Sequence, residues 1–247
     1  MTPTIHNYSR VAGKMLHWDT TDNKDAYVKN LQNPTAYQRL QDLGFLNTQI
    51  DYRYNSHGFR TAEFDQSFDV VCFGCSFTMG TGVHGRDTWP EQLSALTGMS
   101  VANLGHAGSS NDTAVRFALH YLPLLKPRYA VWLQTDRHRI ELLDESFPMS
   151  LNIMASDTTN PCADDFFIKT WFASDSNQQL NRQKNTLAFQ HLCQDLGITS
   201  VVLPREAIPQ HGPYPNGNAR DLTHPGGEVY GVIAQQVHAL LSIPEKT

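Results

Sequence analysis

The sequence predicts an α/β protein in which a parallel sheet carries helices on both faces. Three observations lead to this prediction. Short apolar runs of the buried-strand type alternate with segments that have helical signals, the 247 residues are enough for one large domain, and the composition, 40% hydrophobic and 10% aromatic, is typical of globular proteins. Because strands that alternate with helices are joined by crossover connections, we expect the strands to run parallel in one sheet.

Four strands and four helices alternate along the chain from residue 69 onward. The expected strands cover residues 69–73, 100–104, 128–134 and 198–204. The expected helices cover residues 88–98, 111–125, 177–197 and 226–242. The first strand, DVVCF, is a continuous apolar run, which is typical of a buried strand. A further helix is expected within residues 25–43, where the letters LQNP interrupt it.

Residue types at the helix ends support these boundaries. Thr88 is expected to cap the helix that follows it, because its hydroxyl can accept from a free backbone N–H of the first turn. Asn111 or Asp112 is expected to cap the next helix in the same way. Gly98 and Gly197 are placed to end the helices that precede them.

The chain is expected to form one α/β domain with two additions. Residues 67–247 carry the alternating pattern, whereas residues 1–66 have no clear period and are expected to form an N-terminal extension packed on the core. Residues 144–176 also lack a period but contain many aromatic and apolar residues, so we expect a lid or specificity insertion, or an oligomer contact. Arg60 and Asn55 are expected to pack beneath the edge of the sheet where ligands bind.

Charge and composition exclude several classes of protein. The formal net charge of −5 argues against a nucleic-acid partner, and no apolar run approaches the roughly 20 residues needed to span a membrane. The first residues contain no apolar segment of the signal-peptide kind, so we expect a cytoplasmic protein, with release by another route left open. Cys72 and Cys75 form a C-x-x-C, but no second pair completes a zinc site, so we expect free thiols and no metal.

Three loops are expected to meet at one edge of the sheet, because ligands bind beyond the carboxyl ends of parallel strands. Ser76 follows the first strand, and Gly108 follows the second. A serine becomes a nucleophile only when a base takes its proton and a third group orients that base. Asp221 and His224, three residues apart before the last helix, can supply the acid and the base. The N–H groups of Ser76 and of a glycine such as Gly108 can bind the oxyanion.

Three short segments resemble the SGNH hydrolases, also called GDSL esterases and lipases. The segments are GCSF around Ser76, NLGHAG ending at Gly108, and DLTHP with Asp221 and His224. The resemblance covers the chain from about Val70 onward. It implies a flavodoxin-like α/β/α sandwich of three layers and hydrolysis of an ester or thioester without a cofactor. It also implies that Ser76 is the nucleophile, that Gly108 donates an oxyanion N–H, and that Asp221 and His224 complete a triad.

The sequence departs from the family pattern at two places. Cys75 stands where the family has an aspartate, directly before the serine. The third family segment ends in an asparagine that donates to the oxyanion, whereas this chain reads LQTDRHR there. Arg137, in that segment, or Asn111, at the start of the helix after the second strand, is expected to donate instead.

The expected function is that of a serine esterase that hydrolyses a carboxylic ester through an acyl-enzyme, with an O-acetylated carbohydrate or another small acyl ester as substrate. Several alternatives remain open at this point. The same triad can transfer the acyl group to a sugar hydroxyl, and the fold can serve as a catalytically silent module for glycan binding or assembly. Cys75 can be the nucleophile, or the loop around Ser76 can bind phosphate or a nucleotide.

Overall fold

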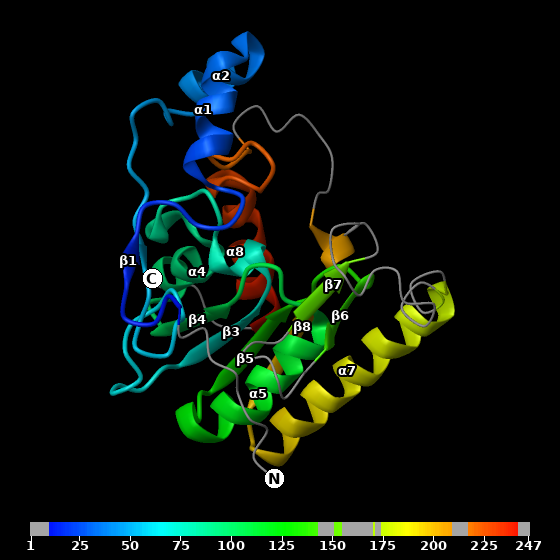
Figure 1. Ribbon diagram of the computed structural model, residues 1–247. Coiled ribbons are helices and arrows are strands. Elements are labelled where there is room, and N and C mark those ends of the chain that lie inside the picture. Colours follow the sequence, from blue (N-terminus) through cyan, green and yellow to red (C-terminus); the bar gives the residue numbers. More distant parts are fainter. Residues whose placement is uncertain (1–9, 143–150, 155–169, 171–173, 209–216, 242–247) are drawn as a thin grey trace.

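The computed structural model describes residues 10–142, 151–154, 170, 174–208 and 217–241. Four parallel strands form the central sheet in the order β4-β3-β5-β8 (Figure 1). The strands are β3 (Val70–Gly74), β4 (Val101–Gly105), β5 (Tyr129–Leu133) and β8 (Thr199–Leu203). In chain order this is the arrangement 2-1-3-4, which is the beginning of the flavodoxin-like strand order. The predicted fold class, an α/β protein with helices flanking a parallel sheet, is confirmed.

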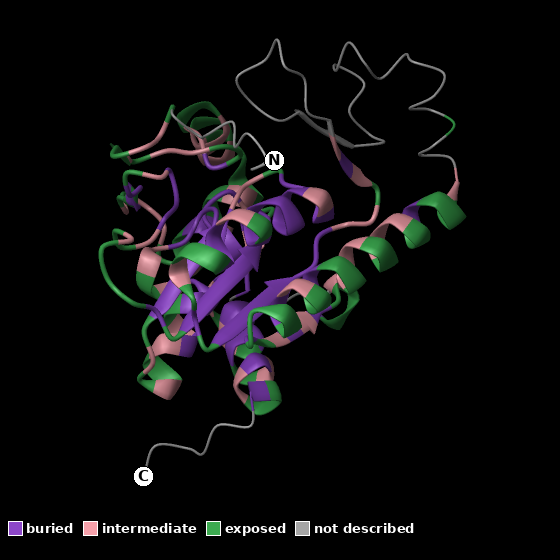
Figure 2. Ribbon diagram, turned by 90° about the horizontal axis from the view of Figure 1, so that it is seen from below, coloured by how far each residue is buried: buried purple, intermediate pink, exposed green. Residues whose placement is uncertain are grey.

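Two pairs of helices cover the two faces of the sheet. These helices are α4 (Trp89–Thr97), α8 (Gly227–Leu241), α5 (Asn111–Leu125) and α7 (Asp175–Asp195). Side chains of Val70 and Cys72 pack with α4 and α8, whereas Val71 and Phe73 pack with α5 and α7, because successive residues of a strand face opposite sides. Strands β3, β4 and β5 are therefore buried on both faces, and Figure 2 shows the sheet as the buried centre of the molecule.

The helix ends follow from local hydrogen bonding. Thr88 caps α4 as predicted, because its hydroxyl accepts from the N–H of Glu91 at 3.5 Å. The cap of α5 is Ser110, not Asn111 or Asp112 as predicted. The Ser110 hydroxyl and Thr113 form a reciprocal capping box, which leaves the Asn111 and Asp112 side chains for contacts elsewhere.

The segment that precedes the sheet contains two helices, α1 (Lys24–Gln32) and α2 (Pro34–Asp42). Asn33 ends the first helix and caps the second, because its side chain accepts from two backbone N–H groups of α2. The predicted interruption at LQNP is therefore a boundary between two helices. Two strands of two residues each, β1 (Met15–Leu16) and β2 (Tyr52–Arg53), pair antiparallel; they are too short to show a sequence period.

A hairpin of β6 (Arg139–Leu142) and β7 (Leu151–Met154) follows the third strand of the central sheet. It was not predicted. Most of the section 144–176, predicted to be a lid or specificity insertion, lies outside the described residues. Among the residues that the structure describes, none of the helices combines the length and the apolar character that a membrane span requires.

Candidate active site

Ser76 lies in a tight turn directly after β3. It is the first residue of α3 (Ser76–Met79), a single helical turn that begins two residues after Gly74. A Cβ atom on Gly74 would lie 2.2 Å from Thr78 Oγ1 and 2.8 Å from the carbonyl oxygen of Leu133, so only glycine fits there. The strand can therefore turn sharply into α3 and hold the Ser76 hydroxyl at the carboxyl edge of the sheet.

The end of β4 packs directly against α3. A Cβ atom on Gly105 would lie 2.3 Å from the backbone nitrogen of Met79, which shows how closely the two segments approach. The Asn103 side chain donates to the carbonyl oxygen of Thr78 at 2.7 Å and accepts from the N–H of Gly105 at 2.9 Å. Asn103 thus fixes the helical turn that carries Ser76, a role that the sequence analysis did not assign.

Ser76, His224 and Asp221 lie in one hydrogen-bonded series. His224 Nε2 is 2.8 Å from Ser76 Oγ, and His224 Nδ1 is 2.6 Å from Asp221 Oδ2. Because an ionised carboxylate only accepts hydrogen bonds, Nδ1 carries the proton and Nε2 is free to accept from the serine. The structure brings together three residues that the sequence analysis named, although Ser76 and His224 are 148 positions apart.

The Asp221 carboxylate accepts five hydrogen bonds. Its Oδ1 accepts from the backbone N–H groups of Thr223 at 3.1 Å and His224 at 3.0 Å. Its Oδ2 accepts from the hydroxyls of Thr21 at 2.6 Å and Thr223 at 2.7 Å, as well as from His224 Nδ1. Burial alone would raise the pKa of Asp221, but the bonds from His224 and Thr21 and the charge of His224 outweigh it and hold the pKa below its ordinary value. Asp221 is therefore ionised at neutral pH.

The backbone N–H groups of Ser76 and Gly108 are the predicted oxyanion donors. Within the described part of the chain, neither the N–H of Ser76 nor that of Gly108 donates to another group. Gly108 is exposed, has a φ of +77°, and has open space where a Cβ atom would stand. Their role as oxyanion donors stays a prediction, and this geometry is compatible with it.

The side chains of the other two predicted donors are engaged elsewhere. The Asn111 side chain accepts from the N–H of Thr135 at 3.0 Å and donates to its carbonyl oxygen at 3.3 Å. The Arg137 guanidinium bonds to Asp175, at the start of α7, at 3.2 Å. The structure therefore does not link either side chain to Ser76, and we leave both out of the proposed oxyanion site.

The Phe77 side chain stands beside the imidazole of His224 and carries a basic side chain on its ring. The Phe77 ring contacts it edge to face, with ring centroids 5.5 Å apart. The guanidinium of Arg205, just after β8, lies 4.2 Å from the centre of the same phenyl ring. Neither Phe77 nor Arg205 was predicted to contribute to the site. Arg60, expected beneath this edge, donates to the carbonyl oxygens of Gly80 and Val83 and so supports the loop after α3.

The thiols and carboxylates of the described residues form no group that could hold a metal ion. Cys72, Cys75 and Cys193 are free and buried, while Cys162 lies outside the described residues. Asn55, expected to pack beneath this edge with Arg60, is buried and accepts from the backbone N–H groups of His57 and Phe59 in its own loop.

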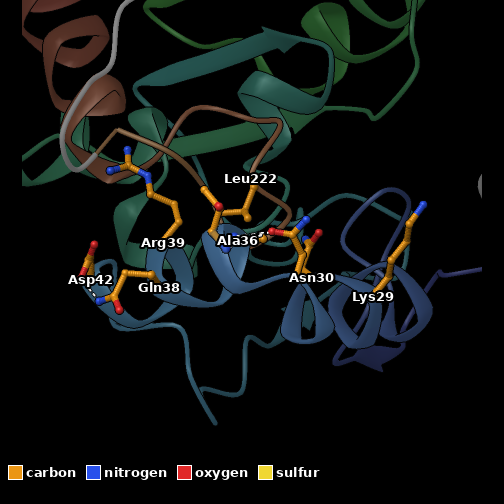
Figure 3. Close-up of a pocket in the computed structure, with 9 residues that line it drawn as sticks. Lys29, Asn30, Ala36, Gln38, Arg39, Asp42 and Leu222 are labelled. Atoms are coloured by element: carbon orange, nitrogen blue, oxygen red, sulfur yellow. Dashed lines mark hydrogen bonds between the residues drawn. The ribbon is translucent and has the colours of Figure 1, made fainter.

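A hollow of about 810 Å³ lies between the two N-terminal helices and Leu222 (Figure 3). Most of the residues that line it are of polar types, among them Lys29, Asn30 and Arg39, and none of the three residues of the Ser76 series lines it. The Arg39 side chain also donates to the side-chain oxygen of Asn218 at 3.0 Å and so joins α2 to the loop that leads to Asp221.

His106 gives the protein a predicted sensitivity to acid. Burial, and secondarily the charge of Arg116, lower the pKa of His106 to about 3, whereas an unfolded chain has a histidine pKa of about 6.5. Between these values the unfolded chain binds one more proton than the folded protein, so stability falls as the pH drops through this window. For His106→Asn we expect the slope of unfolding free energy against pH, measured with urea between pH 4 and 6, to fall by about 1.4 kcal/mol per pH unit.

The exposed His191 provides the matched control. His191→Asn should keep the wild-type slope, because the His191 side chain is 74% exposed and the substitution removes no buried group. A His106→Asn protein with the same slope as the wild type would contradict the prediction.

No family model and no curated protein matches the chain. Solved structures similar to it include a protein from Desulfitobacterium hafniense assigned to the lipolytic G-D-S-L family (15% identity, 69% of this chain and 98% of that one, TM-score 0.36). A second is a lipase/acylhydrolase from Enterococcus faecalis (12% identity, 72% of this chain and 98% of that one, TM-score 0.36). A third is an acetyl xylan esterase from the rumen bacterium Butyrivibrio proteoclasticus (11% identity, 78% of this chain and 66% of that one, TM-score 0.38). Because these TM-scores are below 0.5, we infer the chemistry below from the side-chain geometry alone.

Proposed function

We propose that this protein is a serine-dependent hydrolase of carboxylic esters that works through an acyl-enzyme intermediate. The observation that carries the proposal is the continuous series of hydrogen bonds from Asp221 through His224 to Ser76. The series ends on a hydroxyl at the carboxyl edge of a parallel sheet, where ligands bind in folds of this kind. An ionised carboxylate, an imidazole with the proton on Nδ1 and a serine are the groups that activate a nucleophile for acyl transfer.

In the first half of the proposed reaction, Ser76 Oγ attacks the ester carbonyl carbon while His224 Nε2 takes the hydroxyl proton. Asp221 stabilises the imidazolium that forms and keeps it in line with Ser76. The N–H groups of Ser76 and Gly108 donate to the oxyanion of the tetrahedral intermediate. When the intermediate collapses, the bond to the leaving oxygen breaks, and His224 gives its proton to the alcohol that departs.

In the second half, the acyl group on Ser76 is transferred to water. His224 Nε2 takes a proton from the water as its oxygen attacks the acyl carbon, and the same two N–H groups hold the second oxyanion. The bond from the carbon to Ser76 Oγ then breaks, and Oγ regains its proton from His224. The products are one carboxylic acid and one alcohol, and the protein returns to its starting state.

The proposed substrate is an ester with a small acyl group, such as an acetylated carbohydrate. Ser76 is only 6% exposed among the described residues, and the Phe77 ring stands beside the His224 imidazole that takes the proton from Ser76 in the proposed reaction. A short acyl chain reaches such a hydroxyl with less steric conflict than a bulky one does.

Labelling with a fluorophosphonate tests the proposal directly. The reagent forms a stable bond to a serine only when the serine is activated, so we expect one adduct per chain, mapped by peptide mass spectrometry to Ser76. The same protein unfolded in urea should not react, because the hydrogen-bonded series is then lost. The absence of an adduct on the folded protein, or an adduct on a residue other than Ser76, would overturn the proposal.

A further inference from the structure

Residues 19–22, in the segment before α1, form a tight turn beside the proposed triad. The backbone groups of Asp19 and Asp22 exchange two hydrogen bonds, of 2.9 and 3.0 Å, around Thr20 and Thr21. Thr20 has a φ of +54°, in the left-handed region that β-branched residues avoid. Such a conformation persists only where neighbouring contacts hold it in place.

The contacts that hold the turn come mainly from Arg220, the residue directly before Asp221. Its guanidinium donates to the two carboxylate oxygens of Asp22 at 2.8 and 2.7 Å, and the two side chains are 2% and 1% exposed. The Tyr52 hydroxyl donates to the same carboxylate at 2.5 Å, and the Tyr54 hydroxyl donates to Asp19. Hydrogen bonds therefore hold the turn at both ends, at Asp19 and at Asp22. Arg220, which holds Asp22, is the residue directly before the proposed catalytic acid, Asp221.

The fastened turn places the Thr21 hydroxyl against the proposed triad. Thr21 Oγ1 lies 2.6 Å from Asp221 Oδ2 and 3.4 Å from His224 Nδ1. Asp221 Oδ2 is the same oxygen that accepts from the imidazole. The hydroxyl of Thr223 also donates to this oxygen, but Thr223 belongs to the loop that carries Asp221 and moves with it. Within the described part of the chain, Thr21 provides the side-chain contact that ties this oxygen to a segment outside its own loop.

We infer that Thr21 is a positioning residue for the proposed reaction, supplied by the N-terminal segment to the carboxylate that orients His224. The inference rests on the proposed function. Thr21 holds Asp221 Oδ2 in the direction of Nδ1, so that the imidazole presents Nε2 to Ser76. It acts through Asp221, on the side of the imidazole away from Ser76, and does not reach the reacting atoms. Its loss should therefore slow the chemical step without weakening the binding of substrate.

Thr21→Val keeps the shape of the side chain and removes the hydroxyl. For hydrolysis of p-nitrophenyl acetate we expect kcat to fall about tenfold, with KM within about twofold of the wild type. Thr21→Ser restores the hydroxyl and should restore kcat to within about twofold of the wild type. A Thr21→Val protein with wild-type kcat, or a Thr21→Ser protein as slow as Thr21→Val, would overturn the inference.

Tyr27→Phe is the matched control, because it removes a hydroxyl from the same N-terminal segment without removing a hydrogen bond to the turn of residues 19–22. The Tyr27 hydroxyl donates to the carbonyl oxygen of Phe45 and accepts from the N–H of Asn47. We expect this variant to unfold at a lower temperature while its kcat stays within about twofold of the wild type. If Tyr27→Phe lowers kcat as much as Thr21→Val does, the effect comes from loosened packing of the segment, and Thr21 has no separate positioning role.

The results also separate this inference from the proposed function. If the wild-type protein hydrolyses the ester and the activity depends on Ser76, but Thr21→Val behaves like the wild type, only the role of Thr21 falls. If Ser76→Ala is as active as the wild type, the proposed function itself falls, and the role of Thr21 falls with it.

Discussion

Ser76→Ala is expected to lower kcat for p-nitrophenyl acetate by about ten-thousand-fold, to near the rate of the oxyanion site acting alone. The physical reason is that Ser76 Oγ is the hydroxyl that faces the unprotonated nitrogen of His224, at 2.8 Å. Alanine leaves the imidazole and the two N–H donors in place but removes the atom that forms the acyl-enzyme. Initial rates of p-nitrophenol release, with the uncatalysed rate subtracted, measure the effect.

Ser94→Ala is a suitable control, because Ser94 lies in α4 and its hydroxyl donates to the carbonyl oxygen of Met99. This variant should keep the wild-type rate.

Cys75→Ala tests the alternative in which the neighbouring thiol is the nucleophile. Since the Cys75 side chain is buried and has no hydrogen bond to His224 in the structure, we expect Cys75→Ala to retain activity. An inactive Cys75→Ala together with an active Ser76→Ala would reverse the assignment.

The three residues of the proposed triad could be named from sequence because each lies in a short segment whose local geometry is largely self-contained. In Asp221-Leu222-Thr223-His224, the carboxylate accepts from the N–H of His224 within the same turn, so the spacing alone places acid and base together. Gly74 before Ser76 likewise marks a turn that only glycine can make. The strands and most of the helix ends were also predictable, since apolar runs and capping residues are local signals.

Contacts between distant segments left no such signal. Thr21 is an exposed threonine in a polar stretch, and its bond to Asp221 joins positions 200 residues apart. The misassigned cap of α5 has a related cause. Asn111 is a good capping residue, but its side chain is used in a tertiary contact with Thr135, and Ser110 takes the cap. Sequence therefore predicted the chemistry of the candidate site better than the residues that hold it in position.

Arg220→Met is expected to have the largest effect on stability of the substitutions considered. The Arg220 guanidinium donates to Asp22 and to the backbone carbonyl oxygens of Thr48 and His17, both at 2.9 Å, and it lies 4.0 Å from the centre of the Trp18 ring. Methionine keeps much of the volume but leaves the Asp22 carboxylate buried without its cation. Removing one partner of a buried ion pair costs about 3–5 kcal/mol. For a protein of this size we expect Tm to fall by about 10 °C in a thermal unfolding scan.

A surface ion pair gives the comparison that isolates burial. Arg182 bonds to Glu206 at 2.7 Å, but these side chains are 26% and 57% exposed, so Arg182→Met should cost less than about 1 kcal/mol. Equal losses for the two arginine variants would contradict the prediction.

The double variant Arg220→Met with Asp22→Asn tests whether the stability lost in Arg220→Met comes from the Asp22 carboxylate that is left buried without a cation. Because asparagine carries no charge, this protein should be more stable than Arg220→Met alone, although both residues are changed. If the losses of the two single variants simply add, the carboxylate is not the source of the cost. A recovery of stability without a recovery of kcat would show that the ion pair also keeps the turn of residues 19–22 in place against Asp221. In that case the double variant would fold stably, but the Thr21 hydroxyl would no longer orient the Asp221 carboxylate.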